Sequence, residues 1–180
     1  DEDGKMNSNI SDGSILYIGD VTNKTFIVDK VVTISPDNTS NIIDSKFSFV
    51  DGSDMSLING LTFNNADIGA ITVNNASDIL ISNNIININA AGNVTEFAIL
   101  AQVAKNLIVS SNEIYFTGKT DGYAPANAVR VTESDNAVID DNILEINIPS
   151  CPVGWTEIPA GLGNWVSSPI SEGVVISNSN

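Results

Sequence analysis

Short runs in which apolar and polar residues alternate recur along the chain at a nearly constant interval. The segments that begin at Ala70, Ala98 and Ala128 align without gaps over nineteen residues and are offset by 28 and 30 residues. Each contains a short strand, a polar corner, a second short strand, an asparagine and a third short strand. Period-2 alternation predicts half-buried strands. Three such strands per repeat are typical of a solenoid, whose coils bury their apolar sides by stacking.

The pattern therefore predicts an all-β fold, a right-handed parallel β-helix. We expect about five to six coils of roughly 28–30 residues, with one long excursion. A β-sandwich would need hairpin turns such as Asn-Gly between neighbouring strands, and Asn59-Gly60 is the only pair of this kind.

Alternate apolar residues of each strand are expected to face the interior. In the second strand of the three repeats these residues are Leu80, Ile108 and Val138. The first and third strands contribute Ile71, Val73, Ile99, Ala101, Val129, Val131, Ile86, Ile88, Ile114, Phe116, Leu144 and Ile146.

We expect a single domain over residues 1–180, with an N-terminal cap segment at 1–34 and coils over 35–180. A looser copy of the repeat lies around Phe47 to Phe63. Another copy begins at Gly173 and stops before its second strand. An open parallel edge invites pairing. We therefore expect a fragment whose native chain continues beyond Asn180.

Asparagine is frequent, at 24 of 180 residues, which disfavours helices and suits turns. Asn84, Asn112 and Asn142 occupy the same position in successive repeats, and Asn59 is the expected counterpart in the looser copy. Stacked asparagines can pass side-chain hydrogen bonds from coil to coil. We interpret the row as a structural ladder. The alternative is a row of polar ligand-binding groups.

The third repeat is interrupted by an excursion at residues 147–170, which holds four of the six prolines and both tryptophans. Proline cannot donate to a strand ladder, so this segment should loop off the wall. Insertions in repeat proteins often lie on the binding face. Trp155, Glu157 and Trp165 are therefore the candidate ligand-binding residues. The alternative is that the tryptophans anchor the loop against the coils.

The formal net charge of −15 disfavours nucleic acid and anionic lipid as partners. No apolar run approaches the length of a membrane span, so direct membrane insertion is not expected. The single cysteine, Cys151, cannot form an internal disulfide. We expect an inert thiol there, because the chain has no histidine to activate it.

Many β-helix proteins are polysaccharide lyases or hydrolases, but the residues here favour a protein that is not an enzyme. The absence of histidine excludes histidine-based triads and the usual zinc sites, and no metal ligands are assigned. The lone arginine, Arg130, is expected to point outward from the first sheet. Asp140-Asp141 is the only adjacent carboxylate pair in the repeats, at a polar turn.

No cofactor is expected, although acidic residues at four apparent corners leave room for a weak calcium site. These residues are Asp51, Asp54, Asp121 and Asp135, and they lack EF-hand spacing.

Two stretches carry a family resemblance. The opening segment from Gly13 to Ile34, together with the Asn-rich coils, resembles the large adhesin-like surface proteins of methanogenic archaea. Three parts of the excursion are similar to the same group: Ile148 to Pro152, Glu157 to Val166 and Ser171 to Gly173.

The resemblance covers roughly residues 13–180 and implies an exported module at the cell surface, anchored by other regions. Its expected role is display or adhesion to a host or microbial cell-surface glycan or protein. It transfers no binding or catalytic residue. A carbohydrate-active enzyme and a passive spacer are the alternative functions.

Overall fold

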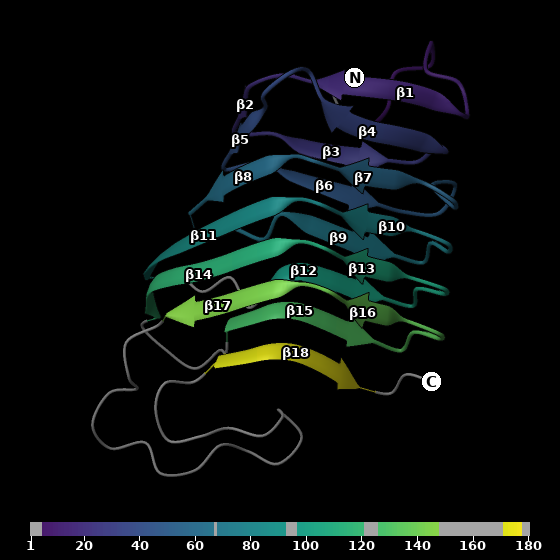
Figure 1. Ribbon diagram of the computed structural model, residues 1–180. Coiled ribbons are helices and arrows are strands. Elements are labelled where there is room, and N and C mark those ends of the chain that lie inside the picture. Colours follow the sequence, from purple (N-terminus) through teal and green to yellow (C-terminus); the bar gives the residue numbers. More distant parts are fainter. Residues whose placement is uncertain (1–4, 67, 93–96, 121–125, 148–170, 178–180) are drawn as a thin grey trace.

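The computed structural model describes residues 5–66, 68–92, 97–120, 126–147 and 171–177, and every regular element among them is a β-strand. The strands form three parallel sheets of six, and each sheet takes every third strand along the chain (Figure 1). The chain therefore visits the three sheets in turn and winds as a right-handed parallel β-helix of six coils. The predicted fold class is confirmed.

We number the sheets by the order in which the chain enters them. Sheet 1 contains β1 (Ser14–Ile18), β4 (Val32–Pro36), β7 (Leu57–Asn59), β10 (Leu80–Ser82), β13 (Ile108–Ser110) and β16 (Val138–Asp140). Sheet 2 contains β2 (Val21–Thr22), β5 (Asn41–Ile43), β8 (Thr62–Asn65), β11 (Ile85–Gly92), β14 (Glu113–Thr120) and β17 (Ile143–Asn147). Sheet 3 contains β3 (Thr25–Val28), β6 (Lys46–Phe49), β9 (Ile71–Asn74), β12 (Phe97–Gln102), β15 (Ala126–Thr132) and β18 (Ser171–Ser177).

Equivalent residues of successive coils stack in register. In sheet 3, Ile71 pairs with Ile99, Ile99 with Val129, and Val129 with Val174. These pairs reproduce the predicted offsets of 28 and 30 residues and place the last strand where the interrupted repeat resumes. The sequence therefore predicted the coil lengths correctly in this part of the chain.

The first coil begins earlier than the sequence suggests. Strands β1, β2 and β3 already pair with β4, β5 and β6, so the expected cap segment at residues 1–34 contains a full coil. The residues before β1 lie against this coil. Lys5 forms a parallel bridge with Ile27, and the Lys30 ammonium donates to the carbonyl oxygens of Asn7 at 3.1 Å and Ile10 at 2.6 Å.

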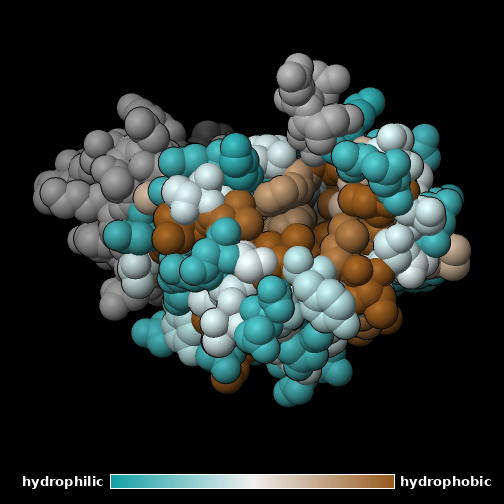
Figure 2. All heavy atoms as spheres, turned by 90° about the horizontal axis from the view of Figure 1, so that it is seen from above, coloured by the Kyte–Doolittle hydropathy of each residue, from teal (hydrophilic) through white to brown (hydrophobic). Residues whose placement is uncertain are grey.

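Side chains from alternate positions of all three sheets fill the interior. Phe26 stacks on Phe47 with ring centroids 4.8 Å apart, and Phe47 meets Phe63 edge-on at 6.1 Å. Figure 2 looks along the axis onto the N-terminal coil, where hydrophobic side chains gather between polar walls. The partly buried hydrophobic residues of the N-terminal part that pack against the core are Met6, Ile10, Leu16, Ile18, Val21 and Phe26.

The prediction for the interior is confirmed in the first strand of the three repeats and wrong in the second. Ile71, Val73 and their equivalents are buried. In sheet 1, however, Ile81 and Val109 are fully buried, whereas Ile108 is 40% and Val138 49% exposed. Three consecutive apolar residues occur at this point of each repeat, such as 79–81, so the sequence does not fix which of them point inward.

The corners explain the abundance of asparagine. Thirteen described residues other than glycine have positive φ, and most of them are Asn, Asp or Ser at corners between strands. Asparagine and aspartate tolerate this left-handed conformation because a short polar side chain hydrogen-bonds locally. Val103, with φ 53°, is the β-branched exception.

Candidate functional site

The corner between sheets 1 and 2 holds a row of stacked asparagines. The Asn84 amide nitrogen, Nδ2, donates to Asn112 Oδ1 at 3.0 Å, and Asn112 Nδ2 donates to Asn142 Oδ1 at 2.9 Å. The same oxygens accept the backbone N–H groups of Asn84 and Asn112, each at 3.0 Å. Each side-chain amide therefore links two coils through both its own chemistry and the backbone.

The fourth expected member of this row is wrong. Asn59 pairs with Ser82 in sheet 1, two positions before the row, and its Oδ1 accepts from Asn83 Nδ2 at 2.8 Å on the outside. The row position in that coil is occupied by Leu61, whose backbone N–H donates to Asn84 Oδ1 at 3.0 Å. The coil that begins at β7 is shorter than its successors, so counting from the later repeats placed the asparagine incorrectly.

The asparagine row has no free capacity for a ligand. Asn84 and Asn112 are fully buried, and Asn112 Nδ2 also donates to the carbonyl oxygens of Ile81 and Ser110, both at 3.0 Å. A buried amide that is hydrogen-bonded in this way rigidifies its surroundings. These contacts support the structural interpretation of the row over the ligand-binding one.

Further polar rows run along the outside. Asn106 Nδ2 donates to Asp78 Oδ1 at 2.9 Å, and Asn136 Nδ2 donates to Asn106 Oδ1 at 3.2 Å, at the corner between sheets 3 and 1. On sheet 2, Asn87 Nδ2 donates to Asn64 Oδ1 at 2.9 Å. These exposed amides bridge neighbouring coils.

The candidate ligand-binding residues of the excursion, Trp155, Glu157 and Trp165, lie outside the described residues, as does Cys151. Their assignment stays a prediction from the sequence. Of the acidic residues considered for calcium, Asp121 also lies outside them.

The remaining charged candidates are dispersed. Arg130 lies on β15, in register with Leu100 of β12 and Val175 of β18. Asp141 follows β16 with positive φ, and its Oδ2 accepts from the Ser111 hydroxyl at 3.1 Å.

The corner carboxylates likewise serve the backbone. Asp54 Oδ1 accepts the backbone N–H of Ser77 at 2.6 Å. Within the described ranges, no group of three or more His, Cys, Asp or Glu residues is arranged to hold a metal ion.

An apolar column on the outer face of sheet 1 is the surface feature that the sequence interpretation missed. Leu57 pairs with Leu80, Leu80 with Ile108, and Ile108 with Val138, so these side chains stack at consecutive coils. One coil further toward the N-terminus stands Thr33, and then Ile15, which is 58% exposed. Neighbouring parallel strands lie about 4.8 Å apart, so the column is continuous along the axis.

A signal for this column was present in the sequence. Each repeat has three successive apolar residues in the second strand, and a strand that is buried on one face alone can hide only alternate ones. Leu107-Ile108-Val109 and Ala137-Val138-Ile139 therefore had to expose at least one apolar side chain each.

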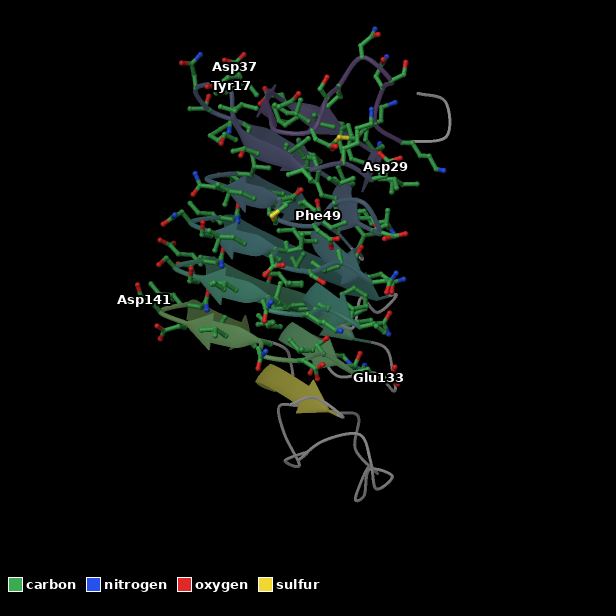
Figure 3. All side chains as sticks on the ribbon, turned by 90° about the vertical axis from the view of Figure 1, so that its right-hand side faces the viewer. Tyr17, Asp29, Asp37, Phe49, Glu133 and Asp141 are labelled. Atoms are coloured by element: carbon green, nitrogen blue, oxygen red, sulfur yellow. The ribbon has the colours of Figure 1, made fainter. Side chains whose placement is uncertain are left out.

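Carboxylates border the apolar column on both sides. Figure 3 shows Tyr17, Asp37 and Asp141 along one edge of the solenoid, Asp29 and Glu133 along the other, and Phe49 in the interior. Sheet 1 itself carries one charged side chain, that of Asp140.

The adjoining part of sheet 2 is also electronegative. The Tyr115 hydroxyl donates to Glu113 Oε2 at 2.9 Å. This hydrogen bond, with partial burial and the negative charges of Glu113 and Glu145, raises the pKa of Tyr115 above its ordinary value of 10.0.

Comparisons with protein-family models, curated proteins and solved structures find no match to this chain. Among the described residues there is no helix long and apolar enough to cross a membrane. The site must therefore be interpreted from its own geometry.

Proposed function

We propose that the chain is a cell-surface module for display or adhesion, which binds a glycan or protein ligand on its outer faces. The observation that carries this proposal is the exposed aliphatic column of Leu57, Leu80, Ile108 and Val138, stacked at consecutive coils of sheet 1. A continuous exposed apolar stripe with a polar rim is a feature of interaction sites.

The architecture supports the same proposal. Side chains fill the interior, and the buried asparagine row fastens one corner coil by coil, so binding chemistry is confined to the outer surface of a rigid rod. Interaction sites built on rigid elements hold their geometry better than sites on loops.

A direct test is the binding of the labelled chain to a glycan array, to intact microbial cells and to a panel of surface proteins. Three forms should be compared: the unchanged chain, a Leu80→Thr, Ile108→Thr variant, and a Trp155→Ala, Trp165→Ala variant. Adhesion predicts binding that at least one variant reduces. If the unchanged chain binds nothing in any panel, the function as a passive spacer replaces this proposal.

The enzymatic alternative has its own readout. Turnover of a polyuronate by the chain, lost on the Asp140→Asn, Asp141→Asn change, would replace adhesion with catalysis.

A further inference from the structure

We propose that the outer face of sheet 1 docks a basic protein segment that carries aliphatic side chains. This inference rests on the adhesive function proposed above and names its partner. The docking face is defined as the column Leu57, Leu80, Ile108 and Val138 with the two corners that flank sheet 1.

Exposed apolar side chains concentrate on this face. Eight large hydrophobic residues are exposed in the described part of the chain, and four of them lie on sheet 1 itself: Ile15, Tyr17, Ile108 and Val138. Three more border it, since Met55 precedes β7 by two residues and Ile85 and Ile143 begin the strands just beyond the asparagine corner. Only Val103 stands apart.

The charges around the docking face have one dominant sign. The sheet 1 strands and their two corners carry two lysines, Lys30 and Lys105, and Lys30 is engaged with the carbonyl oxygens of Asn7 and Ile10. The same region carries ten carboxylates: Asp20, Asp29, Asp37, Asp51, Asp54, Asp78, Glu133, Asp135, Asp140 and Asp141.

This combination selects the chemistry of the partner. Carboxylates at the rim favour cationic groups through electrostatic complementarity, and they disfavour a second copy of a chain whose net charge is −15. Branched aliphatic side chains in the centre favour apolar side chains. Sugar rings stack best on aromatic ones, and Tyr17 is the only aromatic residue in sheet 1. A basic, aliphatic-rich protein segment satisfies both requirements.

The length of the column sets the size of a suitable probe. Four coils at about 4.8 Å spacing give a strip about 14 Å long, which about ten helical residues would cover. A labelled amphipathic peptide of about 18 residues, with leucine on one face and lysine on the other, is therefore adequate. The matched peptides have Glu in place of Lys, or Ser in place of Leu.

The experiment measures the Kd of each peptide by fluorescence anisotropy at low and moderate salt. The Leu80→Thr, Ile108→Thr variant removes the aliphatic centre while keeping β-branched strand formers. The Asp140→Asn, Asp141→Asn variant removes rim charge. The control is Leu100→Thr, an outward position of sheet 3. Circular dichroism verifies that every variant keeps its strands.

The Lys/Leu peptide should bind and the Glu/Leu and Lys/Ser peptides should not. The threonine variant should weaken binding at least tenfold, the asparagine variant severalfold with a smaller salt dependence, and Leu100→Thr should have no effect. Equal binding to all variants, equal binding of the Lys/Ser peptide, or no binding of the Lys/Leu peptide would overturn the inference.

Two outcomes separate this inference from the proposed function. If a glycan from the array is lost on the Leu80→Thr, Ile108→Thr change while no peptide binds, adhesion stands and the protein partner is wrong. If sedimentation shows dimers that the same change dissociates, a second copy occupies the face and the inference also fails.

Discussion

Asn84 and Asn112 stack one coil apart in the corner between sheets 1 and 2, with Asn84 Nδ2 3.0 Å from Asn112 Oδ1 and both side chains fully buried. The same oxygen accepts the Asn84 backbone N–H. A single amide therefore satisfies two donors that no water reaches.

Removing the middle amide should be costly. Asn112→Ala leaves the two Asn84 donors without their acceptor and the Ile81 carbonyl without its donor, so we expect a loss of about 3 kcal/mol in the free energy of unfolding. Urea titration followed by circular dichroism measures it. Asn87→Ala, which removes a bond of similar length on the exposed outside of sheet 2, should cost about 0.5 kcal/mol. Similar losses for both variants would show that the buried row has no special role.

The two adjacent apolar residues of β10 should respond in opposite ways to truncation. Ile81 is fully buried, so Ile81→Ala should destabilise by about 3 kcal/mol, from lost burial and the cavity left behind. Leu80 lies on the outer face and is only partly buried, so Leu80→Ala should cost about 0.5 kcal/mol. Thermal or urea unfolding decides between them. A larger effect at Leu80 would mean that the register of sheet 1 is shifted by one residue.

This pair of residues also marks the limit of what the sequence predicts. The repeat fixed the fold, the coil lengths and the inward residues of sheet 3, because strands such as Ile71 to Val73 alternate clearly between apolar and polar positions. In 79–81 all three residues are apolar, so period 2 has no phase there. The phase of sheet 1 comes from the corner, where Asn84 must turn inward to reach its neighbours.

The candidate site was missed for the same reason. An apolar column assigned to the interior could not be recognised as a surface, although Ile108 and Val138 stand at its centre. The ladder was predicted from equal spacing, which succeeded for Asn112 and Asn142 and failed for Asn59, where the coil is shorter. Spacing alone does not show where residues have been deleted.

Tyr115 should titrate above the ordinary tyrosine value of 10.0, because its hydroxyl donates to Glu113 and the charges of Glu113 and Glu145 oppose its ionisation. Its folded pKa is raised, so the stability that it contributes is present below pH 10 and is lost as the pH rises through the folded pKa. Absorbance titration of the three tyrosines measures the shift, and Tyr115→Phe identifies which curve belongs to it. Glu113→Gln should lower the pKa toward 10, and no change on this substitution would contradict the assigned cause.

Val103 offers a stabilising change. Its φ is 53° on an exposed corner, and a β-branched side chain is strained in that conformation. Asn75 occupies the equivalent corner one coil earlier with φ 55°, and both residues donate their backbone N–H to the next coil at 3.1 Å. Val103→Asn should therefore raise the free energy of unfolding by about 1 kcal/mol, with a higher Tm.

The matched reversal tests the cause of this gain. Asn75→Val puts the same side chain into the same backbone conformation and should destabilise by about 1 kcal/mol. Val103 and Asn75 are both exposed, so a change in buried area explains neither effect. If Val103→Asn and Asn75→Val shift the Tm in the same direction, backbone strain at this corner is not what separates them. Opposite shifts of similar size would establish that the left-handed corner, repeated at every coil, selects asparagine throughout the chain.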